Sequence, residues 1–133
     1  MHWKYHCKLD TEKNFGFVYV ITNKKTSKAY IGCKQYWTYR KGKKYKPSNW
    51  KVYIGSSKTL TEDIKKIGKR NFKFEILGEF TNKRSLRYYE CYYQMKYNVL
   101  SSLLKGTDEP AYYNNYVGGK FYRPVEYHER KVY

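Results

Sequence analysis

Two apolar runs joined by a short polar loop constrain the fold of this chain more than any other feature. The runs cover residues 15–21 and 28–33 and flank the tetrapeptide Asn23-Lys24-Lys25-Thr26. Runs of β-branched and aromatic residues bounded by polar turn residues are typical of strands, and a loop this short joins them as a hairpin. The sequence therefore predicts two antiparallel strands in these two runs.

The register of this hairpin decides which side chains share a face. If Thr22 pairs with Ser27, then Tyr19 lies opposite Tyr30. Because side chains alternate along a strand, Lys28 is expected on the same side as Tyr30. Two phenols and an ammonium group would then lie together, although two tyrosines alone also make an ordinary aromatic cross-strand pair.

The chain carries a large positive charge. Its 133 residues include 28 Lys and Arg against 11 Asp and Glu, a formal net charge of +17. Such an excess favours polyanionic partners, nucleic acid first and an anionic membrane surface second. No apolar run approaches the roughly 20 residues of a membrane-spanning helix, and residues 1–7 lack the apolar core of a signal peptide. Three widely separated cysteines suit neither a disulfide framework nor a zinc site. We therefore expect a cytoplasmic protein with no membrane partner.

The segment from residue 34 to residue 50 is basic and aromatic and contains Pro and Gly. It has no clear period, which predicts an extended or partly ordered loop. A run of charge is often only a solvated face, but here aromatic residues alternate with cations, which also suits phosphate contact. The candidate nucleic-acid-binding residues in and after this segment are Lys34, Arg40, Lys41, Lys43, Lys44, Lys46, Lys51 and Lys58. Residues 119–133 form a second basic aromatic segment, a tail that either lies along the domain or reaches for a ligand.

Three more elements follow. The patterns predict a helix from a cap at Thr59 or Thr61 to Gly68, a third strand over residues 72–77, and a long helix from Thr81 or Asn82 to about Leu104. The expected fold class is α/β (α+β), with a small three-stranded, mainly antiparallel sheet flanked by helices. Length favours one domain over residues 1–133, with a core of about residues 15–118.

The long helix carries an acidic residue on its apolar side. Glu90 lies within a stripe of apolar residues at helical spacing: Leu86, Tyr89, Tyr93, Tyr97, Leu100 and Leu104. A carboxylate that faces a core is costly unless it is paired or binds a cation. Glu90 is therefore either a metal ligand or a buried carboxylate satisfied by Arg87, tyrosine hydroxyls or backbone groups.

The order of these elements, together with several short motifs, resembles the GIY-YIG nuclease family. The second family motif is intact as Tyr30-Ile31-Gly32, and the first is represented by Phe17-Val18-Tyr19, with Gly16 one position early. Small phage-type homing endonucleases are the most similar subgroup, because they also carry a later Tyr-x-Gly-Ser segment, here Tyr53-Ile54-Gly55-Ser56. That subgroup often has His after its Gly-Lys, where this chain has Cys33-Lys34-Gln35.

The resemblance implies a phosphodiester hydrolase that cleaves DNA, most often double-stranded, with one divalent cation, Mg²⁺ or Mn²⁺. It assigns Tyr19 as general base, Tyr30 as a group that orients water or phosphate, and Glu90 as the metal ligand. Arg40 matches the family's arginine, although Lys58 or another cation is an alternative, and Asn114 matches the asparagine near the family's C-terminal end. A lysine ammonium beside a phenol favours the phenolate, so we expect Lys28 to lower the pKa of Tyr19 from its usual value near 10.

Two other functions are open at this point. The chain could be a non-catalytic nucleic-acid-binding protein on the same scaffold, or an unrelated basic RNA-binding protein. Glu90 discriminates between them, since a carboxylate on an apolar face serves a metal site and serves a pure binding protein poorly. Sequence specificity would come from the basic segment and the tail or from a separate partner, and a homodimer could cut both strands. For a phage-encoded member the compartment is the host-cell cytoplasm.

Overall fold

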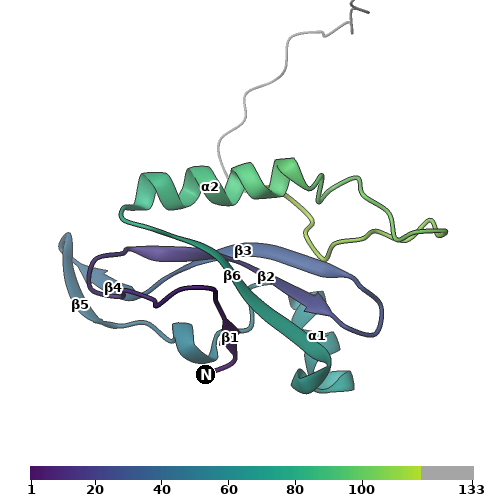
Figure 1. Ribbon diagram of the computed structural model, residues 1–133, viewed down its shortest axis with the longest axis horizontal. Helices are drawn as coiled ribbons and strands as arrows, with labels where there is room; N and C mark the ends of the chain where they lie inside the picture. The colour runs from purple at the N-terminus through teal and green to yellow at the C-terminus, as the bar shows by residue number, and fades with distance from the viewer. Residues whose placement is uncertain (118–133) are drawn as a thin grey trace, which may run out of the picture.

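The computed structural model describes residues 1–117, and the predicted tail at residues 119–133 lies outside the described residues. A four-stranded sheet forms the centre of the molecule, with helix α2 (Lys83–Lys96) on one face and helix α1 (Lys58–Ile67) on the other (Figure 1). This mixed α+β arrangement confirms the predicted fold class. Within residues 1–117, no helix combines the length and apolar character needed to cross a membrane.

The sheet contains one strand more than predicted. Its order is β1-β6-β2-β3, where β2 (Gly16–Asn23) is antiparallel to both β3 (Ala29–Gln35) and β6 (Phe72–Phe80). The extra strand is the two-residue β1 (Trp3–Lys4), which pairs in parallel with β6. β1 forms because the indole of Trp3 is buried in the core and donates a hydrogen bond to the carbonyl of Trp50. The predicted third strand at residues 72–77 is confirmed and extends to Phe80.

The predicted register of the β2–β3 hairpin is wrong by two residues. Thr22 pairs with Ala29, and Tyr19 pairs with Gly32 rather than with Tyr30. The connection is longer than expected because the side chain of Asn23 accepts hydrogen bonds from the backbone of Lys25 and Thr26 and so folds a turn of its own. A shift of two keeps every side chain on its predicted face, so Tyr19 and Tyr30 are diagonal neighbours.

The prediction of a loop over residues 34–50 is wrong. β3 continues to Gln35, and a separate hairpin follows, made of β4 (Trp37–Arg40) and β5 (Lys43–Pro47). Its two-residue turn has Lys41 at φ 53° and Gly42 at φ 77°. Positive φ at both central positions matches the type I′ turn that suits the twist of paired strands. The chain then forms a short 3-10 helix, Trp50–Val52.

The helices differ from their predicted ends. The N-cap of α1 is Ser57 rather than Thr59 or Thr61, and its side chain accepts a hydrogen bond from the backbone N–H of Leu60. The predicted end of α1 at Gly68 is confirmed. A 3-10 turn, Lys69–Asn71, then leads into β6. The N-cap of α2 is Asn82, one of the two predicted caps. α2 ends at Lys96, eight residues before Leu104, because Asn98 adopts φ 53° and stops the helix.

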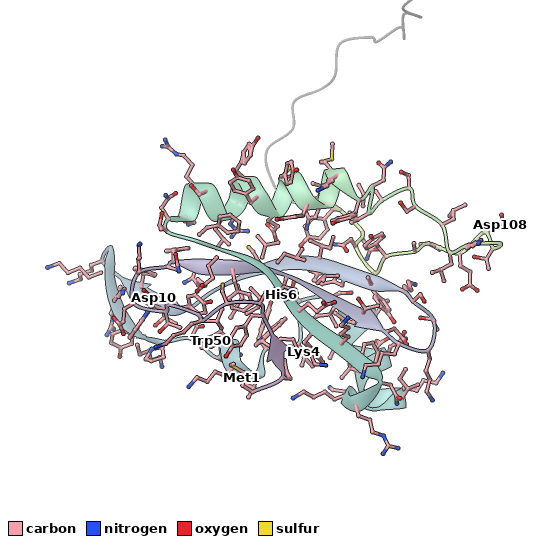
Figure 2. All side chains as sticks on the ribbon, in the orientation of Figure 1. Met1, Lys4, His6, Asp10, Trp50 and Asp108 are labelled. Carbon is pink, nitrogen blue, oxygen red and sulfur yellow. The ribbon has the colours of Figure 1, made fainter. Side chains whose placement is uncertain are left out.

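Two clusters of buried side chains hold the layers together. On the α1 face, Leu60 and Ile64 pack against Phe17, Ile21 and neighbouring aromatic residues, including Trp50, which Figure 2 shows on the side of the sheet away from α2. On the α2 face, Leu86 packs in a cluster with Val18, Ile31 and Val99. The buried side of α2 is Leu86, Glu90 and Gln94, whereas Tyr89 and Tyr97 of the predicted stripe are exposed.

Candidate active site

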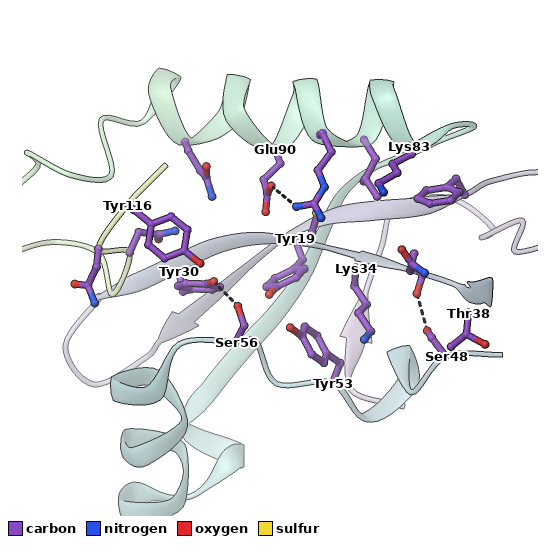
Figure 3. Close-up of a pocket in the computed structure, with 18 residues that line it drawn as sticks. Tyr19, Tyr30, Lys34, Thr38, Ser48, Tyr53, Ser56, Lys83, Glu90 and Tyr116 are labelled. Carbon is purple, nitrogen blue, oxygen red and sulfur yellow. Dashed lines mark hydrogen bonds and ion pairs between the residues drawn. The ribbon is translucent and has the colours of Figure 1, made fainter. Parts of the chain in front are cut away.

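A pocket of about 350 Å³ lies at the β3 side of the sheet (Figure 3). Its lining comes from β2, β3, the loop after the first 3-10 helix, α2 and the segment after Tyr113. The lining residues that bear on chemistry are Tyr19, Tyr30, Cys33, Lys34, Tyr53, Ser56, Lys83, Arg87, Glu90 and Asn114. Of the predicted catalytic residues, Tyr19, Tyr30, Glu90 and Asn114 are therefore together, and Lys28 and Arg40 are not.

The position of β3 explains how one pocket draws on both faces of the sheet. β3 is an outer strand, so side chains from the α1 side and from the α2 side can meet beside it. Tyr19 and Tyr30 approach from the α1 side, and Glu90 approaches from α2. Gly32 makes room at the meeting point, because a Cβ atom there would lie 2.6 Å from the Tyr19 hydroxyl. The glycine of the second motif is therefore required by the close approach of Tyr19.

Four tyrosines line the pocket, and three of them, Tyr19, Tyr30 and Tyr53, have neighbouring rings. The ring centroid of Tyr19 lies 6.2 Å from that of Tyr30 and 6.1 Å from that of Tyr53. The hydroxyl of Tyr30 is hydrogen-bonded to Ser56 Oγ at 2.9 Å. Within residues 1–117 the hydroxyl of Tyr19 makes no hydrogen bond to another side chain or to the backbone, although the residue is only 1% exposed. That hydroxyl is therefore available to a water molecule or a substrate atom in the pocket.

Burial raises the pKa of Tyr19 well above 10, and the neighbouring Tyr30 and Tyr53 add to the effect. Burial also raises the pKa of Tyr30, although its hydrogen bond to Ser56 acts in the opposite direction. The expectation that Lys28 lowers the pKa of Tyr19 is wrong. The ammonium of Lys28 lies 4.8 Å above the ring of Tyr113, at the far end of β3 and outside the pocket.

Glu90 is the only acidic residue that lines the pocket among those the structure describes. It is 9% exposed, and helical spacing from Leu86 and Gln94 directs it inward. Its carboxylate lies 3.6 Å from the guanidinium of Arg87, which is one of the partners that the sequence offered. Burial and then the charge of Glu90 raise the pKa of the Cys33 thiol to about 12, so Cys33 is a neutral neighbour.

The cations of the pocket are Lys34, Lys83 and Arg87. With Glu90 they give a net charge of +2, which suits a phosphate group. The ammonium of Lys34 lies 4.2 Å above the ring of Tyr53, and burial lowers the pKa of Lys34. Arg40 instead lies near the tip of the β4–β5 hairpin, 5.0 Å from the ring centre of Tyr45. The structure therefore brings Lys34 and Arg87, rather than Arg40, to the phenols.

The remaining predicted nucleic-acid-binding residues lie outside the pocket. Four belong to the β4–β5 hairpin and its turn: Lys41, Lys43, Lys44 and Lys46. Lys51 lies in the 3-10 helix after the hairpin, with its ammonium 5.8 Å from the ring centre of Trp50, and Lys58 is the first residue of α1.

Asn114 secures the outer side of β3. Its side chain accepts a hydrogen bond from the backbone N–H of Ile31 and donates one to the carbonyl of the same residue. The residues just before Asn114 form backbone hydrogen bonds with Ala29, so the segment 111–114 runs beside β3 like a further strand. Asn114 thus positions β3, and with it Tyr30 and Gly32.

Sequence reasoning missed Tyr53, Ser56, Lys83 and Arg87 as lining residues. The similarity of Tyr53-Ile54-Gly55 to Tyr30-Ile31-Gly32 was a usable signal, because a Cβ atom at Gly55 would also lie 3.6 Å from the Tyr19 hydroxyl. Arg87 precedes Glu90 by about one helical turn, so the sequence indicated that it lies beside Glu90. Lys83, at the start of α2, gave no such signal.

The pocket could hold a divalent cation through one carboxylate. Within the described part of the chain no group of three or more His, Cys, Asp or Glu side chains comes together. Mg²⁺ is commonly bound by one or two carboxylates, with water and phosphate oxygens in the other positions. A single buried carboxylate that opens into a cationic pocket fits that coordination.

Comparison with known proteins agrees with this geometry. Residues 3–117 match the family model described as the GIY-YIG domain of the putative endonuclease segE. The chain is also 30% identical over 116 residues to endonuclease segA of Enterobacteria phage T4, an alignment that covers 87% of this chain and 44% of that protein. The chain thus spans less than half the length of the curated relative that it matches. No solved structure matches the chain.

The family match covers both strands of the tyrosine hairpin, the second Tyr-Ile-Gly segment, α2 and Asn114, which are the elements that build the pocket. The protein belongs to the GIY-YIG family of nucleases.

Proposed function

We propose that this protein is a DNA endonuclease that hydrolyses a phosphodiester bond in the β3 pocket. The observation that carries the proposal is the meeting of Tyr19 with Glu90, Lys34 and Arg87 in one pocket of net positive charge. Family membership and the similarity to a phage endonuclease support the reaction class.

Lys34 and Arg87 bind the scissile phosphate. Their side chains line the pocket from β3 and from α2, and Figure 3 shows Lys34 beside Tyr19. A guanidinium and an ammonium held near a transferring phosphate stabilise the charge that grows in the transition state. In this proposal Lys34 and Arg87, rather than Arg40, stabilise the phosphate charge as the family's arginine is expected to do.

Tyr19 is the general base, and Tyr30 positions the phosphate or the water. A base must lie within hydrogen-bond reach of the proton that it removes. The Tyr19 hydroxyl has no competing partner among the described residues, whereas the Tyr30 hydroxyl is bonded to Ser56. Because burial keeps Tyr19 protonated near neutral pH, its activity as a base increases with pH.

A divalent cation, Mg²⁺ or Mn²⁺, is held by Glu90. When bound it supplies positive charge that stabilises both the phosphate and a nearby phenolate. Arg87 then pairs with phosphate as well as with Glu90, from which it lies 3.6 Å in the free protein.

Nicking of supercoiled plasmid DNA with Mg²⁺ or Mn²⁺ tests the proposal. Glu90→Gln should reduce the rate by at least about 10³-fold, and Tyr19→Phe should reduce it by about 10²–10⁴-fold, the range of a general base. Tyr30→Phe should have a smaller effect than Tyr19→Phe. Binding of DNA without divalent metal should change less than twofold for all three.

Exposed residues of the same types provide the controls. Glu62→Gln on α1 and Tyr88→Phe on α2 lie outside the pocket and should nick at the wild-type rate. If the wild type binds plasmid but leaves it intact with every divalent metal, the protein is a binding module rather than an endonuclease. Full activity of Glu90→Gln would remove Glu90 from the proposed site.

A further inference from the structure

We propose that the β4–β5 hairpin is a two-stranded ribbon that enters the major groove of double-stranded DNA beside the cleavage pocket. In this arrangement the face bearing Arg40, Lys43 and Lys46 contacts the DNA. The inference rests on the proposed function for the location of the cut, but the binding that it describes does not need cleavage.

One face of the hairpin is packed against the protein. The ring of Tyr39 stacks on Phe15 with centroids 5.2 Å apart. The indole of Trp37 donates to the carbonyl of Thr11, and the ammonium of Lys44 donates to the carbonyl of Glu12 and lies 3.7 Å from its carboxylate. These contacts fix the ribbon on the domain rather than leaving it a mobile loop.

The other face is cationic and open. Arg40 pairs across the ribbon with Lys43, and both lie on the same face as the Thr38–Lys46 pair. The guanidinium of Arg40 lies 5.0 Å from the ring centre of Tyr45, and the ammonium of Lys46 lies 5.7 Å from it. Among residues 1–117 the ion pairs involve Lys44, Lys73 and Arg87, so Arg40, Lys43 and Lys46 have no carboxylate partner. This face is therefore available for an external anion.

The open face continues into the pocket. Thr38 lies on that face, exchanges hydrogen bonds with the backbone of Lys46, and also lines the pocket. In Figure 3, Thr38 and Ser48 lie at one end of the pocket and Tyr116 at the other, with Tyr19 and Glu90 between them. A DNA backbone seated over Glu90 and Lys34 could therefore continue past Thr38 onto the open face of the ribbon.

The dimensions fit the major groove of duplex DNA. Paired strands lie about 4.8 Å apart, and the major groove, about 12 Å wide, admits a two-stranded ribbon. The minor groove is about half as wide, so a ribbon could enter it only by widening or bending the duplex. An arginine at the ribbon's end can bind guanine through O6 and N7, which gives Arg40 a means of reading sequence.

Matched triple variants test the proposal on 30-base-pair duplexes in EDTA. Arg40→Ala/Lys43→Ala/Lys46→Ala should weaken binding at least tenfold and reduce the slope of log K against log salt by about 2–3, since each lost phosphate contact contributes about 0.9. Lys25→Ala/Lys65→Ala/Lys66→Ala removes the same charge from exposed sites on the hairpin turn of β2–β3 and on α1. It should change binding less than threefold.

Methylation of guanine N7 identifies the groove. It should weaken wild-type binding at a cluster of guanines within about one helical turn of the cut. The triple variant Arg40→Ala/Lys43→Ala/Lys46→Ala should lose this methylation interference. Arg40→Lys, which keeps the charge, should keep the salt slope but lose part of the interference. Equal losses in the two triple variants, or a wild type insensitive to N7 methylation, would overturn the proposal. A wild type that shows interference but never cleaves would refute the nuclease activity and leave the groove contact standing.

Discussion

The pocket and the hairpin use the same kinds of residue, tyrosines and cations, under opposite physical conditions. In the pocket, Tyr19 is 1% exposed and Glu90 is 9% exposed. Burial and the neighbouring phenols raise the pKa of Tyr19, and the carboxylate of Glu90 pairs with the guanidinium of Arg87. On the hairpin, every residue of β5 is exposed, and Arg40 and Lys46 rest on the ring of Tyr45 rather than on a carboxylate.

This difference separates chemistry from binding. A desolvated group interacts strongly with nearby charges, so the pocket can act on one phosphate. Solvated lysines and arginines bind many phosphates weakly and in a salt-dependent manner. Lys34, predicted from the sequence only as a nucleic-acid-binding residue, falls in the first class, and Arg40, predicted as catalytic, falls in the second.

The largest test compares these two residues directly. Lys34→Ala should reduce kcat by about 10²–10³-fold, as expected when a donor to the transition state is lost. Arg40→Ala should leave kcat within about threefold of wild type and raise KM instead. Single-turnover cleavage of a defined duplex separates the two parameters, and a kcat loss in Arg40→Ala equal to that of Lys34→Ala would erase the distinction between the regions.

The pH dependence of cleavage should follow the buried phenol. Because burial raises the pKa of Tyr19 well above 10, its ionised fraction increases about tenfold per pH unit over the neutral range. The single-turnover rate should therefore rise by about 10²-fold from pH 7 to pH 9, and Tyr19→Phe should flatten the profile. A wild-type plateau below pH 8 would point to a base with a lower pKa.

Gly32 should not be replaceable without loss of activity, because a side chain there would displace Tyr19. In Gly32→Ala the new Cβ would lie 2.6 Å from the hydroxyl and 2.8 Å from Cζ of Tyr19, so the buried ring must move. A displacement of this size is expected to cost up to about 10²-fold in rate and about 1–3 kcal/mol in stability. Gly78→Ala on β6, whose nearest contact would be 3.2 Å to the Phe80 ring, serves as the comparison. Equal activity of the two variants in nicking assays would show that Tyr19 is not constrained as described.

The smallest effect concerns the support of the pocket. Asn114→Ala removes both side-chain hydrogen bonds to Ile31 and should lower the free energy of unfolding in urea by about 1–3 kcal/mol. Asn115 is the next residue and is exposed, so Asn115→Ala should leave the free energy of unfolding unchanged. If Asn114→Ala lowers the rate without lowering stability, Asn114 acts on the substrate rather than on β3.

Much of the fold could be predicted from sequence, and four of the six residues predicted as catalytic line the pocket. The period-2 and period-3.6 patterns located the central strands and α2, and they placed Glu90 on the buried side of its helix. Tyr19, Tyr30 and Asn114 were predicted from motif spacing, and all three line the pocket.

The errors have local physical causes. The hairpin register depended on how Asn23 folds its turn, and a one-residue conformation at Asn98 ended α2 early. The β4–β5 hairpin was missed because its type I′ turn uses Lys41-Gly42 rather than Asn-Gly or Asp-Gly, and because lysines obscure the alternation of β5. Lys28 and Arg40 lie outside the pocket because Lys28 is at the far end of β3 and Arg40 is at the tip of a hairpin that the sequence did not predict.

The strand-like segment at residues 111–114 has a consequence for incomplete chains. Any copy that stops before Asn114 leaves the outer groups of β3 unpaired, and such an open edge is a template for pairing with another chain. The same copy would lack part of the pocket. The chain must thus be synthesised through Asn114 before the complete pocket can form, so truncated products should aggregate or be degraded.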